Sequence, residues 1–180
     1  MKHTLTVPEH VGELTIQQFQ AIHNSTDTIE QVAVACGVSR DFVNQMDLPS
    51  LERVVEVMGQ FDPEVDRKWG LVRKLEHEGV TYGFHPNLSE ITVGEMADLE
   101  TMLQDLYSNL VPIMTVLYRP IVEQHGDFYS IKPYTGAARL STFERVKMEV
   151  VLGALSFFLR CATAFVMSSR QSLTEVKAAR

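Results

Sequence analysis

The segment from Ser141 to about Ser169 constrains the fold of this 180-residue chain more than any other stretch. It starts Ser-Thr-Phe-Glu, the spacing of a capping box, in which the Ser141 and Glu144 side chains satisfy backbone N–H groups at a helix start. From Met148 to Met167 the residues are apolar on almost every side of a helix. Such a helix must be covered on most sides, so we predict a long C-terminal helix that is either the centre of the core or shared between subunits.

The same segment has about the 20 residues that a membrane span requires. However, Glu149 and Arg160 lie within it, and an Arg at the centre of a bilayer costs at least about 2.5 kcal/mol. Residues 1–15 contain Glu9 and Glu13 and no apolar run, which is unlike a signal peptide. We therefore expect no membrane association.

The formal net charge of −7 is distributed unevenly along the chain. Residues 1–128 are acidic, whereas residues 129–180 hold eight Lys or Arg against three Asp or Glu. Nucleic acids require a concentrated positive surface, so an acidic body with a basic end favours protein partners. Cys36 and Cys161 are isolated in apolar surroundings and are expected to be buried thiols in a reducing compartment.

No pattern of catalytic or metal-binding residues stands out. The six His residues are scattered, without an HxxxH or HxH pair, and the chain has no nucleophile elbow, Walker loop or dinucleotide fingerprint. The Asp and Glu residues fall mostly at predicted helix starts or on predicted exposed faces. We therefore expect a protein that is not an enzyme and that uses neither a cofactor nor a metal.

Several helix starts can be placed from the sequence. Further capping boxes begin at Thr15 and Thr92, and Ser50 is expected to cap a helix. The helix that Ser50 is expected to cap has an apolar stripe formed by Leu51, Val54, Val55 and Met58. A short apolar helix is predicted from Leu110 to Tyr118, where Pro112 is tolerated in the first turn.

Strand patterns are fewer. Lys2 to Val7 alternates polar and apolar residues and predicts a short strand. Trp69 to Leu75 and Val80 to Phe84 carry alternating large apolar side chains and predict a β-hairpin, with Gly79 in its turn. Because an isolated hairpin is only marginally stable, it is expected to lie on a helix or to pair with a further strand, either Asp127 to Lys132 or the N-terminal segment.

Together these patterns predict a mainly α, α+β fold, a helical domain with a small β-hairpin or sheet packed on the long C-terminal helix. The polar, Pro-containing stretch after Phe61 indicates an internal boundary. We expect an N-terminal helical part at residues 1–61 and a second part at residues 62–180, together forming one compact domain.

The segment from Ile29 to Met46 resembles a helix-turn-helix of bacterial repressors. Gly37 supplies a left-handed turn position and Ser39 caps the second helix. Around that helix, however, one cation, Arg40, stands against the anions Asp41 and Asp47, and DNA-binding helices usually present several cations. A plain helix-packing unit is therefore favoured, and a DNA-binding regulator acting through residues 39–46 is kept as an alternative.

Several segments, in this order, resemble a group of tailed-bacteriophage proteins. The matching segments are Glu13 to Ile22 (ELTIQQFQAI), the two-helix unit with Gly37-Val38-Ser39, Leu48 to Ser50, Tyr82 to Glu100 (YGFHPNLSEITVGEMADLE), Leu117 to Ile121 (LYRPI), Tyr129 to Tyr134 (YSIKPY) and the paired Phe157 and Phe158. The resemblance extends from about Leu5 to Phe165. It implies a tail assembly chaperone, which holds the tape-measure protein or other tail proteins, or alternatively a minor virion structural or connector protein.

The resemblance implies partners among phage tail or other structural proteins, with the host cytoplasm as the place of action, or the virion if the chain stays in the particle. Homo-oligomerisation is a further expectation, because a single domain that cannot cover its apolar helix needs another chain to do so. The hypothesised protein-contact set lies on the C-terminal helix and consists of Val150, Val151, Ala154, Phe157, Phe158, Cys161 and Phe165.

Overall fold

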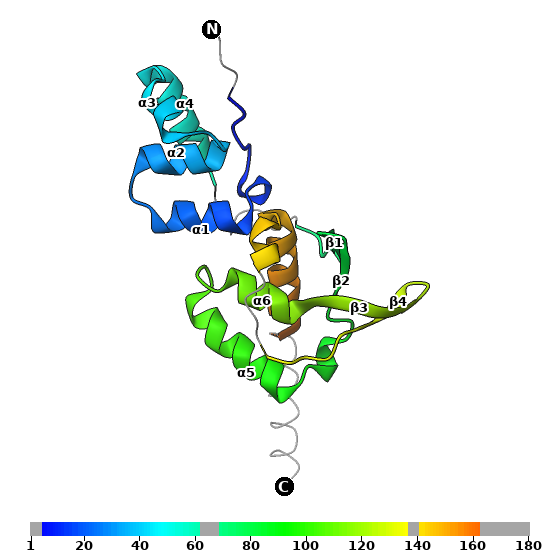
Figure 1. Ribbon diagram of the computed structural model, residues 1–180. Helices are drawn as coiled ribbons and strands as arrows, with labels where there is room; N and C mark the ends of the chain where they lie inside the picture. Colours follow the sequence, from blue (N-terminus) through cyan, green and yellow to red (C-terminus); the bar gives the residue numbers. More distant parts are fainter. Residues whose placement is uncertain (1–4, 62–68, 137–140, 163–180) are drawn as a thin grey trace.

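The computed structural model describes residues 5–61, 69–136 and 141–162 (Figure 1). The α-helices are α1 (Ile16–Asn24), α2 (Thr28–Cys36), α3 (Arg40–Asn44), α4 (Leu48–Met58), α5 (Val93–Met102), α6 (Leu110–Leu117) and a C-terminal helix that is described over residues 148–162. The strands are β1 (Lys74–His77), β2 (Val80–Phe84), β3 (Tyr118–His125) and β4 (Phe128–Ile131). They form one antiparallel sheet in the order β1-β2-β3-β4, so the predicted α+β class is confirmed.

The N-terminal helices begin largely where the sequence predicts. Both groups of the capping box at Thr15 and Gln18 are present. In the two-helix unit, Gly37 ends α2 in the left-handed region with φ of 65°, and Ser39 accepts a hydrogen bond from the backbone N–H of Phe42 at the start of α3. The unit packs on α4 through a small core of its own, made of Val32, Ala33, Val43 and Val54.

Two N-terminal predictions are wrong. Ser50 does not cap α4, because the cap is Asp47, three residues earlier, whose carboxylate accepts a hydrogen bond from the Ser50 backbone N–H. Residues 5–7 of the predicted strand from Lys2 to Val7 are not in a strand. Leu5 and Val7 instead pack against the small core, and residues 1–4 lie outside the described part of the chain.

The sheet grows from the predicted hairpin. β1 and β2 are joined by Glu78 and Gly79, both with positive φ, the backbone that a two-residue hairpin turn requires. The first strand begins at Lys74 rather than Trp69. The predicted strand from Asp127 to Lys132 is present as β4, but its partner is β3. The sequence interpretation did not foresee β3, which follows α6 directly and carries Pro120.

The C-terminal helix does not begin at Ser141. Residues Ser141–Arg145 form a short 3-10 helix instead. The chain then makes a bridge in which the Val146 carbonyl accepts from the Ile16 N–H and the Met148 N–H donates to the Leu14 carbonyl. These bonds replace helical ones, so the helix starts at residue 148. Its predicted continuation to Ser169 lies outside the described residues, and no helix in the described part is long and apolar enough to cross a membrane.

The C-terminal helix lies in the middle of the molecule, between the N-terminal helices and the sheet (Figure 1). Its first turns are enclosed: Met148, Val151 and Ala154 are at most 1% exposed. Gly153 lets the backbone at Gly70 approach so closely that a Cβ atom at position 153 would lie 2.3 Å from the Gly70 carbonyl oxygen. A glycine in mid-helix is unfavourable by itself, so this close contact explains why it is there.

We expect Gly153→Ala to destabilise the fold by about 2 kcal/mol, because a backbone carbonyl cannot move aside as a flexible side chain would. The matched control is Gly94→Ala in α5, where a Cβ atom would lie 4.0 Å from the nearest ring atom of Tyr134. That change should be neutral or stabilising by up to about 1 kcal/mol. Chemical denaturation measures both, and equal stability of the two variants would contradict the packing described here.

Candidate functional site

The start of α5 is organised around a buried carboxylate. In the capping box, the Glu95 Oε2 atom accepts hydrogen bonds from the Thr92 backbone N–H and from its hydroxyl, each at 2.7 Å. The Thr92 hydroxyl in turn accepts from the Glu95 N–H at 3.3 Å. Glu95 is only 1% exposed, because position 95 lies on the same face of α5 as the buried Leu99 and Met102.

Two buried basic residues face the same carboxylate. Arg119 Nη2, from β3, lies 2.7 Å from Glu95 Oε1, and His85 Nε2, immediately after β2, lies 3.7 Å from the same oxygen. The Arg119 guanidinium also lies over the Tyr134 ring, 5.8 Å from its centroid, and the Tyr134 hydroxyl donates to the Asp98 carboxylate. These contacts tie α5, the sheet and the segment after β4 together.

The electrostatics of this cluster follow from burial. Burial alone would raise the pKa of Glu95, but the Thr92 hydrogen bonds and the Arg119 charge outweigh it, so the pKa lies below the ordinary value. Burial lowers the pKa of His85, with the Glu95 charge acting in the opposite direction. Around neutral pH Glu95 is therefore ionised and His85 is neutral, and the Arg119 guanidinium is the counter-ion of the Glu95 carboxylate.

A large apolar groove opens beside this cluster. Its volume is about 750 Å³. One wall is the segment that leads into α5, and the other is the end of the described C-terminal helix. The lining residues are His85, Pro86, Asn87, Leu88, Ser89, Ile91, Thr92, Val93, Met96, Phe157, Phe158, Cys161 and Ala162. Val93 is 88% exposed at the first position of α5, so a large apolar side chain stands unshielded at the rim of the groove.

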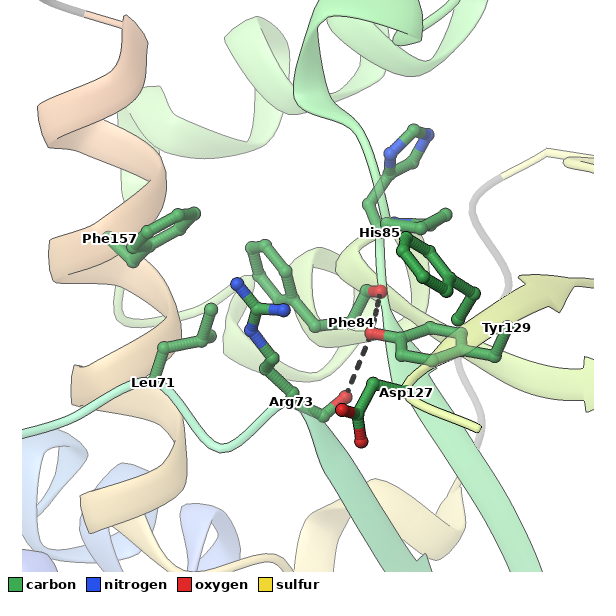
Figure 2. A pocket seen from close by; sticks show the side chains of 9 residues that line it. Leu71, Arg73, Phe84, His85, Asp127, Tyr129 and Phe157 are labelled. Carbon is green, nitrogen blue, oxygen red and sulfur yellow. Dashed lines mark hydrogen bonds between the residues drawn. The ribbon is translucent and has the colours of Figure 1, made fainter. Parts of the chain in front are cut away.

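A smaller cavity of about 160 Å³ adjoins the groove and shares His85, Pro86 and Phe157 with it. Figure 2 shows Phe157 of the C-terminal helix directed toward Phe84 of β2, and their rings make an edge-to-face contact with centroids 5.6 Å apart. On the sheet side, the Tyr129 hydroxyl lies 2.7 Å from the Phe84 carbonyl oxygen and 3.1 Å from the Arg73 carbonyl oxygen, and these two acceptors share its single proton. These contacts join the C-terminal helix, β2 and β4 around the cavity.

The structure divides the predicted contact set. Val150, Val151 and Ala154 are buried in the core of this chain. Phe157, Phe158 and Cys161 line the groove, although Phe158 is only 4% exposed. Phe165 lies outside the described residues. The structure thus brings three of the seven residues to a concave surface, and their contact with another protein stays a prediction.

Sequence reasoning missed the other wall of the groove and the buried ion cluster. It placed Glu95 in a capping box, which is confirmed, but expected no role for this carboxylate beyond the helix start. The spacing of Glu95, Leu99 and Met102 at i, i+4 and i+7 is the signal that would have found it, since these positions share one helix face. No comparable signal identifies Arg119, because the strand that carries it was not predicted.

The described residues thus define an α+β protein that combines a buried ion cluster with an adjoining apolar groove, and they contain no group of three His, Cys, Asp or Glu side chains placed to hold a metal ion. No family model matches the chain, and no curated protein or solved structure is significantly similar to it.

Glu95→Gln is expected to destabilise the fold by about 3 kcal/mol, because it leaves the Arg119 charge buried without its anion. Glutamine can still accept the capping hydrogen bonds, so the decrease in stability reports the loss of the ion pair alone. Glu100→Gln, on the exposed face of the same helix, is the control and should change the free energy of unfolding by no more than about 0.5 kcal/mol. Urea denaturation measures both, and a stable Glu95→Gln protein would refute the proposed importance of the pair.

The same cluster predicts acid sensitivity. The pKa of folded His85 lies below its ordinary value of 6.5, so the unfolded chain binds a proton that the folded chain resists, and stability decreases as the pH falls through 6.5. The low pKa of Glu95 adds a second loss as the pH falls below its ordinary value of 4.5. His85→Gln should make the free energy of unfolding less dependent on pH between pH 7 and pH 5. His125→Gln, at an exposed position, controls for loss of an imidazole. An identical slope for wild type and His85→Gln between pH 7 and pH 5 would contradict this.

Proposed function

We propose that this chain is a non-enzymatic protein-binding factor whose groove holds an apolar segment of another protein. The observation that carries the proposal is the groove itself, which is large, apolar and open. Clefts of roughly 300 to 1,000 Å³ with mainly apolar linings are where proteins usually bind small molecules, so the groove is within the size range of binding sites. An amphipathic helix laid into such a groove buries its apolar face and leaves its polar face in water.

The phage resemblance supports a more specific role, that of a tail assembly chaperone for the tape-measure protein or other tail proteins, acting in the host cytoplasm. Two segments of that resemblance, Tyr82 to Glu100 and the paired Phe157 and Phe158, supply both walls of the groove. A chaperone needs a surface that accepts apolar segments of differing sequence. Met96 suits that need because its flexible thioether side chain adapts to differently shaped contacts.

The geometry of the two-helix unit favours a protein partner over DNA. Arg40 Nη2 lies 2.6 Å from the Asp27 carboxylate, and Arg40 Nη1 lies 3.4 Å from Glu30. The one cation of α3 is therefore engaged by two anions of its own chain. Both would have to be displaced before Arg40 could contact a phosphate, and α3 is only five residues long.

Val93→Glu tests the groove. An acidic residue in the first turn of a helix is tolerated or favourable, so the fold should persist while the charge at the rim opposes apolar contacts. Leu48→Glu is the matched control, because Leu48 is 65% exposed at the first position of α4, outside the groove. Co-expressed tape-measure protein from the same genome should stay soluble with wild type and Leu48→Glu and become at least about threefold less soluble with Val93→Glu.

Tape-measure protein that is equally insoluble with and without this chain would refute the chaperone role. Mass spectrometry of purified virions then separates the two phage roles. A chaperone should be absent from mature particles, whereas a connector or minor structural protein should be present in a fixed copy number.

A further inference from the structure

We propose that two copies of this chain associate about a two-fold axis at the small cavity, so that Arg73 of each copy pairs with Asp127 of the other and each Phe128 packs into the other copy's cavity. The small cavity shares His85, Pro86 and Phe157 with the large groove, but Arg73, Asp127 and Phe128 line the small cavity alone. The association is argued from these three residues and does not rest on the proposed function.

The first observation is an exposed aromatic ring beside a hollow. Phe128 is 84% exposed at the start of β4, and the β3–β4 hairpin that carries it projects from the body of the molecule (Figure 1). Phe128 also borders the small cavity, whose floor includes the apolar side chains of Leu71, Phe84 and Phe157. A protruding ring next to a concave apolar surface is a pair of complementary shapes on one face.

The second observation is a pair of opposite charges on the same wall. Arg73 and Asp127 both line the cavity and are both exposed (Figure 2). Neither forms an ion pair with another described residue, in contrast to Arg40, Arg119 and Arg145, which all do. A cation and an anion at the rim of an apolar hollow present charge to whatever covers it.

These features select a second copy as the occupant. In a two-fold interface the same patch occurs on both subunits, so residue i contacts residue j and residue j contacts residue i. A patch that contains both a ring and a hollow, and both signs of charge, is complementary to itself under that rotation.

Charge reversal tests the pairing directly. Arg73→Asp places two like-charged pairs across the axis, and so does Asp127→Arg. Each variant should therefore weaken self-association by about tenfold or more, measured by sedimentation of the purified full-length chain over a concentration series. Mixing the two variants should restore the dimer, because one copy then carries both anions and the other carries both cations. Phe128→Ser should also weaken association, without loss of helical circular dichroism, since the ring is exposed.

The controls are Arg53→Asp and Glu56→Arg, which reverse charges at exposed positions of α4 and should leave self-association unchanged alone or mixed. Val93→Glu should also leave it unchanged, so failure of the dimer is distinguishable from failure of the groove. A wild-type chain that is monomeric throughout the concentration series would overturn the proposal. So would a dimer that neither reversal weakens, or one that the mixture fails to restore.

Discussion

The rest of the structure depends on how the apolar C-terminal helix is covered. Its first turns are enclosed by the bridge between residues 14–16 and 146–148 and by the backbone at Gly70, which touches Gly153. Further along the helix the cover thins. Phe157, Cys161 and Ala162 are only half-buried, and Leu159 is 44% exposed. The groove lies where the enclosure ends, so its apolar character is a direct result of the helix that forms its wall.

The opposite wall of the groove, at the start of α5, is anchored by the ion pair between Glu95 and Arg119. Glu95 takes its hydrogen bonds from the start of its own helix and its counter-ion from β3, which positions α5 relative to the sheet. Buried ion pairs contribute little net stability compared with apolar packing, but removing one partner is costly. The Glu95–Arg119 pair therefore constrains α5 relative to β3 beside the groove. Tyr134, which contacts both Arg119 and Asp98, extends that constraint to the segment after β4.

Local signals in the sequence predicted local structure well. The capping boxes at Thr15 and Thr92 and the glycine turn at Gly37 are confirmed because their hydrogen bonds lie within a few residues of each other. The Ser141 box failed for the opposite reason. Residues 146–148 bond to residues 14–16, a contact over more than a hundred residues that no local pattern reveals. The groove was only half predictable for the same reason, since one wall has an apolar pattern and the other is brought to it by the fold.

The close fit at Gly12 has a spectroscopic consequence. Trp69 is the single tryptophan of the chain, and its indole ring fills the space above Gly12 so fully that a Cβ atom there would lie 2.4 Å from it. His10 lies alongside, with ring centroids 5.2 Å apart. The tryptophan fluorescence of the protein therefore arises from one position, where the segment around Gly12 meets the start of the described range 69–136. The emission wavelength and the quenching of Trp69 report whether those two parts are in contact, without any added label.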